Sequence, residues 1–190
     1  MYDIIVIGAG PAGASAAIYT AKAGKKTLVL ENDQSVTKPA WIRNHYGAPD
    51  IDGPELLKVG QEQAKSFGAE IVSEEVTEVS NEGNGQVKVK TENNEYEAKY
   101  VILATGNSAK LAEASGITTK EGTEPRIKTI VDADNDGRTS MENVWAAGVT
   151  AGVSVHTIIT AGDGANVAIN ILSEMNGERY ADHDMLKDKE

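Results

Sequence analysis

Apolar residues and glycines alternate in blocks over the first part of the chain. Residues 2–7 (YDIIVI) form a nearly continuous apolar run, as expected for a strand buried on both faces of a parallel sheet. A glycine-rich turn follows at Gly8–Gly13, and the small residues of Ala14–Ala23 predict a helix that ends at Gly24. Thr27–Glu31 (TLVLE) predict a second buried strand. The pattern therefore predicts a strand–helix–strand unit with parallel strands.

The rest of the chain divides into shorter blocks of the same kinds. Apolar residues at helical spacing predict two more helices, at Pro54–Phe67 and His156–Met175. Short alternating segments predict an antiparallel meander over residues 70–79, 86–91 and 96–100. Further blocks predict a buried strand at 100–104, a hairpin over 127–139 that turns at 135–137, a short strand at 144–147, and long connections at 31–54 and 107–124.

Length and composition agree with one globular domain. The chain has 190 residues, of which 40% are apolar and 25% charged, far from the polar composition of a disordered chain. We expect an α/β fold with a parallel sheet, a β-meander crossover and a C-terminal helix. We expect this single domain to cover residues 1–175, followed by a polar tail over 176–190.

Charge and cysteine content exclude several functions. A net charge of −11 argues against a nucleic-acid partner or an anionic membrane surface. The absence of cysteine excludes disulfides, thiolate metal sites, a cysteine nucleophile and an internal dithiol relay. The uncharged stretch 4–21 is interrupted by glycines and a proline, so it predicts strand, turn and helix rather than a membrane span. With no signal peptide, we expect a cytoplasmic protein.

The strongest chemical signal is the turn GAGPAG, which matches the dinucleotide-binding pattern G-x-G-x-x-G. It follows a predicted strand, opens a predicted helix, and precedes Glu31 at the end of the next strand by 18 residues. Gly8 permits the tight turn, Gly10 lets the backbone approach a pyrophosphate, and Gly13 permits close packing of helix and strand. Glu31 would accept hydrogen bonds from ribose hydroxyls. The alternative is a glycine-rich turn without a ligand, and the pattern alone does not choose between FAD and NAD.

Four motifs in order resemble one family. They are GAGPAG, YVILATG at Tyr100–Gly106, RTSMENVWAAG at Arg138–Gly148 and TAGDGANVAINI at Thr160–Ile171. Together they resemble the FAD domain of the thioredoxin reductase family, within the pyridine nucleotide-disulfide oxidoreductases. The resemblance implies a Rossmann-like domain that binds FAD in extended form. IRNHYG and DGPELL, within residues 42–57, are similar to the family's loop under the flavin.

The chain departs from the family pattern at two places. The family inserts an NADPH-binding domain with a redox-active CxxC where this chain has only residues 107–124, so the chain is similar to the small, single-domain, thioredoxin-reductase-related proteins. The family's Gly-Asp on the ribityl-phosphate side of the flavin is Gly148-Val149 here, which places one FAD contact in doubt unless the Val149 N–H serves.

The resemblance implies a set of site residues spread over the chain. His156 falls in the first turn of the last predicted helix. There it would add a proton or a hydrogen bond at the flavin, and the alternative is that it lies in water. His156 is the one catalytic candidate. Trp41, His45 and Tyr46 would cover the ring or, with more weight, pack the loop. The expected cofactor-binding residues are Gly8, Gly10, Pro11, Ala12, Gly13, Glu31, Asn32, Asn44, Val76, Ala104, Thr105, Gly106, Gly148, Val149, His156 and Thr157.

Two further patterns are rejected. Asp132–Gly137 begins like a calcium-binding loop, but Asn143 stands where that loop needs Glu, so we expect no metal. Gly162–Val167 is similar to a second G-x-G-x-x-G, but Val167 is bulky where a small residue is needed and no later strand ends in an acid. We therefore expect no internal site for a pyridine nucleotide.

The leading hypothesis is an FAD-dependent oxidoreductase that passes electrons from an external donor, either NAD(P)H or a partner protein, to a second acceptor. The alternative is a non-catalytic FAD-binding module, such as a sensor, a carrier or one subunit of a split reductase. A weaker alternative is an NAD-binding protein without flavin. The resemblance also implies a homodimer.

Overall fold

A parallel sheet forms the centre of the computed structural model, which describes residues 1–186. Its strands are β1 (Tyr2–Ile7), β2 (Thr27–Glu31), β5 (Glu70–Ser73), β8 (Glu95–Leu103) and β11 (Val144–Ala146). They lie side by side in the order β5-β2-β1-β8-β11, and every neighbouring pair is parallel. The carboxyl ends of all five strands therefore meet at one edge of the sheet.

Both faces of this sheet are buried, as the apolar runs predict. In β1, Ile4 and Val6 belong to the core on one face, while Ile5 and Ile7 belong to the core on the other. All four side chains are 5% exposed or less. The continuous apolar run of β1 thus fills two cores at once, which is the physical reason for the pattern.

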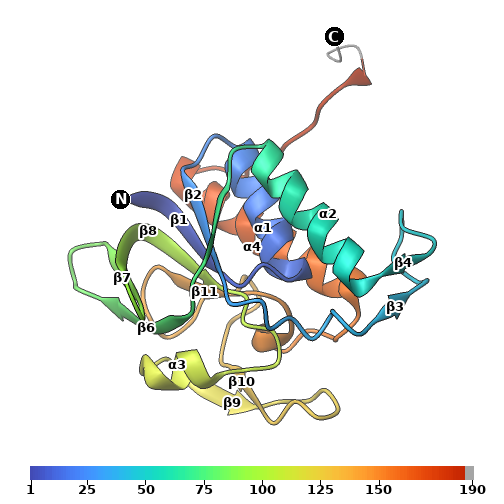
Figure 1. Cartoon of the computed structure of the whole chain (residues 1–190). Coiled ribbons are helices and arrows are strands. Elements are labelled where there is room, and N and C mark those ends of the chain that lie inside the picture. The colour runs from blue at the N-terminus through green and yellow to red at the C-terminus, as the bar shows by residue number, and fades with distance from the viewer. Residues whose placement is uncertain (187–190) are drawn as a thin grey trace.

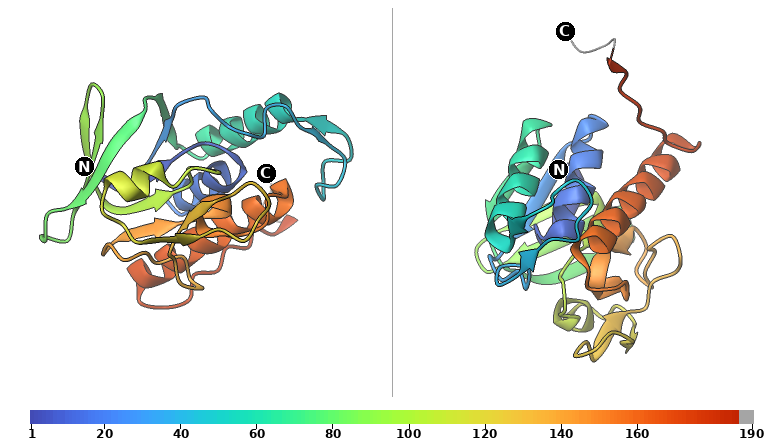
Figure 2. Two further views of the ribbon diagram at one scale, coloured as in Figure 1. Left: turned by 90° about the horizontal axis from the view of Figure 1, so that it is seen from below. Right: turned by 90° about the vertical axis from the view of Figure 1, so that its right-hand side faces the viewer.

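Three helices cover one face of the sheet (Figure 1; Figure 2, right). They are α1 (Pro11–Lys22), α2 (Gly53–Ser66) and α4 (Thr157–Asn176). Helices α1 and α4 approach very closely, because a Cβ atom on Gly164 would lie 2.0 Å from the carbonyl oxygen of Ala12. The small residues of α1 and Gly164 of α4 allow this contact.

The other face carries the meander and a short insertion. Strands β6 (Val76–Asn81) and β7 (Val87–Thr91) pair antiparallel with each other and with the first half of β8. Helix α3 (Lys110–Ala114) packs against β6, and β9 (Thr119–Glu121) and β10 (Thr129–Val131) form an antiparallel hairpin below it (Figure 1).

The predicted α/β fold is confirmed, with differences in several elements. Helix α1 begins at Pro11 rather than Ala14, so the second half of the glycine turn is already helical. The segment predicted as one strand over 70–79 is divided into β5, which pairs with β2 in the parallel sheet, and β6, which pairs with β7 in the meander. The two strands predicted at 96–100 and 100–104 are one strand, β8, whose first half pairs with the meander and whose second half pairs with β1 and β11.

The predicted hairpin over 127–139 is wrong. Its first half, β10, pairs with β9, which lies in the segment predicted to be an irregular connection. The turn at 134–137 does exist, because the Asp134 carboxylate accepts hydrogen bonds from the N–H groups of Asp136 and Arg138. The residues after this turn do not pair with β10, since Arg138 forms an isolated bridge with Trp145 instead.

Smaller elements complete the fold. Strands β3 (Trp41–Ile42) and β4 (Ile51–Asp52) pair antiparallel within the predicted loop, and η1 (Gly148–Ala151) is a 3₁₀ turn after β11. After α4, the Lys22 ammonium pairs with the carboxylates of Asp182 and Asp184, so this part of the tail lies against α1. The last four residues of the predicted tail lie outside the described residues. None of the helices within residues 1–186 is long and apolar enough to cross a membrane.

Candidate functional site

A groove of about 830 Å³ runs along the carboxyl edge of the sheet. The strand order places Glu31 at one end, Gly8 and the Ala104–Gly106 segment in the middle, and Val149 toward the other end. The volume is within the range of pockets that hold a cofactor or substrate. The groove lies where open α/β sheets bind ligands.

The glycine turn forms the middle of the groove floor. Gly10 is the N-cap of α1, and no side chain in the described part of the chain caps this helix. The first-turn N–H groups of α1 therefore face the groove together with the positive end of the helix dipole, which suits a phosphate. A Cβ atom on Gly10 would meet only the Ser35 Oγ atom, at 3.6 Å, so the missing side chain leaves open space here.

Gly8 and Gly13 have a different task from Gly10. Gly8 has a φ of +100°, and a Cβ atom on Gly13 would lie 1.8 Å from the Gly8 carbonyl oxygen. No other residue fits at Gly13 without moving α1 away from β1. These two glycines therefore permit the turn and the close packing, and Gly10 alone opens the groove.

Glu31 is held in place by the backbone. Its carboxylate accepts hydrogen bonds from the N–H of Ala9 and from the N–H of Asp33, the latter at 2.7 Å. The side chain thus joins the end of β2 to the glycine turn, and its remaining lone pairs can accept from hydroxyls of a ligand in the groove. Asn32 and Val76 line the same end.

The middle and far end of the groove are tied together by hydroxyls. The Thr105 hydroxyl donates to the Ser108 carbonyl at 2.6 Å and lies 3.1 Å from the Thr150 hydroxyl. Because Thr105 follows β8 and Thr150 follows β11, this contact fixes the two strand ends relative to each other.

Asp163 is a supporting residue that the sequence analysis did not single out. Its carboxylate accepts a hydrogen bond from the Gly148 N–H at 2.6 Å, across the contact between α4 and η1. Burial raises the pKa of Asp163, and the hydrogen bond from Gly148 opposes this shift. Gly148 has a φ of +79°, so Asp163 holds a left-handed turn that presents Val149 to the groove. The position of Asp163 in the TAGDGA motif was the sequence signal that could have identified it.

The structure brings most of the predicted site residues to the groove and leaves five outside its lining. Gly13 and Gly148 are packed closely against neighbouring atoms of the fold. Asn44 lies in the loop between β3 and β4, and His156 and Thr157 lie at the start of α4, outside the lining. The predicted residues that line the groove are Gly8, Gly10, Pro11, Ala12, Glu31, Asn32, Val76, Ala104, Thr105, Gly106 and Val149.

The aromatic loop contacts α4 and also has contacts within itself. The His45 Nδ1 atom lies 3.0 Å from the Thr157 hydroxyl, which joins the loop to the start of α4. Trp41 does contact its own loop, because its indole N–H donates to the Asp50 carboxylate at 2.7 Å and the Arg43 guanidinium lies over its ring at 4.3 Å. Tyr46 is 92% exposed, so the expectation that it packs the loop is wrong. His156 is exposed at the N-cap of α4, with its Nδ1 atom 2.8 Å from the Ser154 hydroxyl.

The β9–β10 hairpin also contributes residues that the sequence analysis missed. Pro125, Arg126 and Ile127, at its tip, line the groove. The segment was predicted to be a connection and a misplaced hairpin, so nothing in its pattern placed it near the glycine turn.

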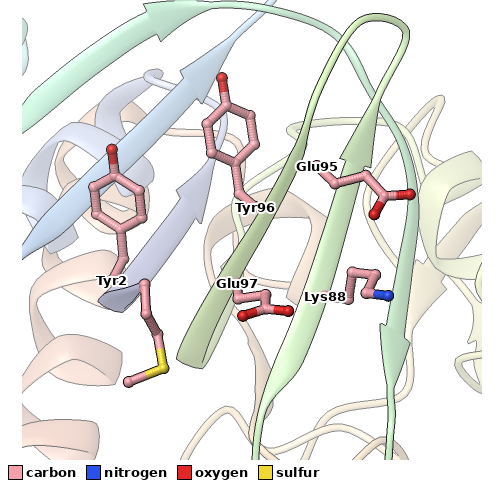
Figure 3. A pocket seen from close by; sticks show the side chains of 6 residues that line it. Tyr2, Lys88, Glu95, Tyr96 and Glu97 are labelled. Atoms are coloured by element: carbon pink, nitrogen blue, oxygen red, sulfur yellow. The ribbon is translucent and has the colours of Figure 1, made fainter.

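A second, smaller hollow of about 310 Å³ lies at the opposite edge of the sheet (Figure 3). Tyr2 and Tyr96 face each other there edge to face, with ring centroids 6.4 Å apart. The Tyr2 hydroxyl donates to Glu70, and burial together with this carboxylate raises the pKa of Tyr2 to about 12. The charged residues of this hollow, Lys88, Glu95 and Glu97, lie together on β7 and β8, on the side away from Tyr2 (Figure 3).

Within residues 1–186, no three His, Asp or Glu side chains come together as metal ligands would. In the aspartate-rich turn, the Asp136 carboxylate pairs with Arg138 and the Asp134 carboxylate caps the turn itself.

The fold and the groove together define a dinucleotide-binding α/β domain. The sequence model of the pyridine nucleotide-disulphide oxidoreductases matches residues 2–133. The chain therefore belongs to the pyridine nucleotide-disulphide oxidoreductase family. FAD is the cofactor of this family, which confirms the predicted cofactor.

Individual relatives are thioredoxin reductases. The chain is 46% identical to the enzyme of Aquifex aeolicus (strain VF5) over 110 residues, which are 56% of this chain and 34% of that protein. It is 39% identical to that of Peptoclostridium litorale over 147 residues, 75% of this chain and 45% of that protein. The chain thus spans between about a third and about half of the length of these relatives.

Solved structures agree with the fold. The atypical thioredoxin reductase TRi from Desulfovibrio vulgaris Hildenborough superposes with a TM-score of 0.82 at 20% identity, over 94% of this chain and 99% of that chain. The predicted resemblance to the thioredoxin reductase family is confirmed.

Proposed function

We propose that the groove binds one FAD in extended form and that the chain is an FAD-dependent oxidoreductase. The observation that carries the proposal is the groove itself, which passes Glu31, the α1 N-terminus, Thr105 and Val149 in the order in which an extended dinucleotide would meet them. The bound FAD would supply the redox chemistry, and the chain would bind, orient and shield it.

The residues fit the cofactor from one end of the groove to the other. The adenosine half would lie at Glu31, Asn32 and Val76, where the Glu31 carboxylate accepts from ribose hydroxyls. The diphosphate would lie at Gly10, Pro11 and Ala12, on the uncapped N-terminus of α1.

The other half of the cofactor would run past Ala104, Thr105 and Gly106 to the far end of the groove. The Val149 N–H would serve there in place of an aspartate side chain. Asn44, His156 and Thr157 would approach the ring from beyond the groove wall. His156, already hydrogen-bonded to Ser154, would hold a proton near the ring.

The electron donor and acceptor are proposed to be external. These 190 residues contain no cysteine, so the thiols of a dithiol relay would have to lie outside them. Between β8 and β11 the chain has only α3 and the β9–β10 hairpin, so hydride from NAD(P)H would come from free nucleotide or from a partner protein. We also propose one FAD-binding domain over residues 1–175 and assembly as a homodimer.

The test is anaerobic addition of NADH or NADPH to the FAD-loaded protein, followed by its visible spectrum. Loss of the flavin absorbance band supports direct reduction by the nucleotide. His156→Gln should then slow reduction while FAD stays bound. Conversely, if neither nucleotide, nor a chemically reduced partner protein, changes the spectrum, the proposed oxidoreductase activity is wrong.

The second candidate is a non-catalytic FAD-binding module or one subunit of a split reductase. The short connection between β8 and β11 favours it, because no second nucleotide-binding domain is inserted there. This candidate predicts a stable flavin spectrum with both nucleotides, and a subunit of a split reductase would be reduced only when the other subunit is added.

A further inference from the structure

The tip of the β9–β10 hairpin is anchored at the far end of the groove. The loop 122–128 is closed at its base by the Gly122 N–H, which donates to the Lys128 carbonyl at 3.0 Å. At its tip, the Glu124 carboxylate accepts from the Ser154 hydroxyl at 3.4 Å and from the Val155 N–H at 3.3 Å. The loop is therefore attached to the segment that leads into α4.

Apolar packing holds the other side of the same loop. Ile127, Ile130 and Val149 form a small buried cluster, each 9% exposed or less. Because Val149 follows β11, this cluster fixes the hairpin over the end of the groove that would hold the flavin half of FAD. Hydrogen bonds on one side and packing on the other leave the residues between Glu124 and Ile127 facing the groove.

Arg126 occupies a position in this loop that favours glycine. The Ile127 N–H donates to the Glu124 carbonyl at 3.1 Å, which closes a four-residue turn with Pro125 second and Arg126 third. Arg126 has a φ of +68°, the left-handed conformation that the third position of such a turn requires. A residue with a side chain is less stable in this conformation than glycine. Local strain of this kind is a reason to look for a function of the side chain.

The Arg126 side chain places an unpaired positive charge at this end of the groove. Among the ion pairs within residues 1–186, none includes Arg126. The other cation that lines the groove, Lys110, begins α3 in the connection after β8, whereas Arg126 lies in the loop that packs against Val149 through Ile127. Of the two lining cations within the described residues, Arg126 is thus the one held at the Val149 end of the groove.

We propose that Arg126 stabilises the negative charge that the ring of bound FAD gains on reduction, and so sets the reduction potential of the cofactor. This inference rests on the proposed function. Uptake of two electrons and one proton from an external donor adds one net negative charge to the ring. A nearby guanidinium favours this charged state over the neutral, oxidised one, and it does so in a chain whose own net charge is −11.

The expected effect is moderate, because Arg126 is exposed and salt screens its charge. We expect the ratio of affinities for reduced and oxidised FAD to fall on the order of tenfold when the charge is removed. For a two-electron couple, a tenfold change corresponds to about 30 mV in midpoint potential. The shift should shrink as the salt concentration rises.

The experiment measures the midpoint potential of the FAD-loaded protein with a reference dye for four variants. Arg126→Gln and Arg126→Gly should lower the midpoint potential by about 30 mV. Arg126→Lys keeps the positive charge, so its midpoint potential should stay close to that of the wild type. Lys128→Gln is the matched control, because Lys128 is in the same loop, is exposed and does not line the groove; its potential should stay near that of the wild type.

Arg126→Gly separates electrostatics from structure. Glycine relieves the strained backbone, so its unfolding free energy should equal or exceed that of the wild type while its potential falls. If both Arg126→Gly and Arg126→Gln have the potential of Lys128→Gln, the inference is wrong although FAD still binds. If the wild-type chain itself binds no FAD, the proposed function is wrong, and this inference with it.

Discussion

The individual glycines of the fingerprint turn have different roles, as the motif predicts. A side chain on Gly13 would overlap the Gly8 carbonyl, directly after β1, whereas a side chain on Gly10 would project into the groove. The same motif therefore contains one residue needed for folding and one needed for the ligand, and two substitutions can separate these tasks.

Gly10→Val should lose FAD and keep the fold. We expect the dissociation constant for FAD to rise on the order of 100-fold, equal to about 3 kcal/mol, because the valine would occupy the diphosphate position. The unfolding free energy should fall by only about 1 kcal/mol, through the weaker N-cap. Gly13→Ala, in contrast, should cost about 3 kcal/mol or more, since its Cβ atom would lie 1.8 Å from the Gly8 carbonyl oxygen.

These two variants are compared by FAD titration and by urea unfolding. A Gly10→Val protein that keeps full FAD occupancy would contradict the assignment of the diphosphate site. A Gly13→Ala protein as stable as the wild type would contradict the packing role.

The buried carboxyl of Asp163 should make the unfolding free energy depend on pH. Because burial raises the pKa of Asp163 above the ordinary 3.8, there is a pH range in which the native state keeps the proton and the unfolded chain has released it. The stability of the wild type therefore falls as the pH rises through this range. Asp163→Asn has no such loss, so the unfolding free energy of the variant minus that of the wild type should increase from about pH 4 to about pH 7. A difference that is constant or decreases over this range would contradict the role of burial.

Site residues could be predicted from the sequence where local chemistry decides their role. Gly8, Gly10 and Glu31 follow from strand, turn and helix in one continuous unit, and all three line the groove. Arg126 could not be found in this way, because its place depends on how a hairpin far along the chain packs against Val149.

Among the elements, α2 has the clearest local signal. Asp52 is its N-cap, and the carboxylate accepts from the Glu55 N–H at 2.8 Å. Asp52→Ala should lower the unfolding free energy by about 1 kcal/mol and the melting temperature by about 2–4 °C.

Asp52→Asn is the control for this cap, because asparagine caps as well as aspartate does. FAD affinity should be unchanged in both variants, since Asp52 does not line the groove. If Asp52→Asn destabilised the protein as much as Asp52→Ala, the negative charge rather than the cap hydrogen bond would matter.

Elements with local signals were predictable, and pairing between distant segments was not. The buried runs of β1 and β2 and the apolar spacing of α2 and α4 gave correct elements. The division of 70–79 into β5 and β6 depends on pairing with β2 in one case and β7 in the other. The β9–β10 pairing was not predicted either, because three-residue strands have almost no periodicity.

At the scale of the whole molecule, the site is a product of the topology. Five parallel strands end at one edge, α4 returns from the far end of the chain to pack on α1, and the β9–β10 hairpin reaches over the groove from the opposite face. Removal of FAD should therefore loosen contacts between segments that are distant in sequence. At a free FAD concentration 100 times the dissociation constant, binding should raise the unfolding free energy by about 2.7 kcal/mol.

The most direct measurement is the visible spectrum and FAD content of the purified protein after incubation with FAD and removal of the unbound cofactor. We predict a flavin spectrum with about one FAD per chain, lost in Gly10→Val. A folded, colourless wild-type protein under these conditions would contradict the assignment of the groove and the function proposed for it.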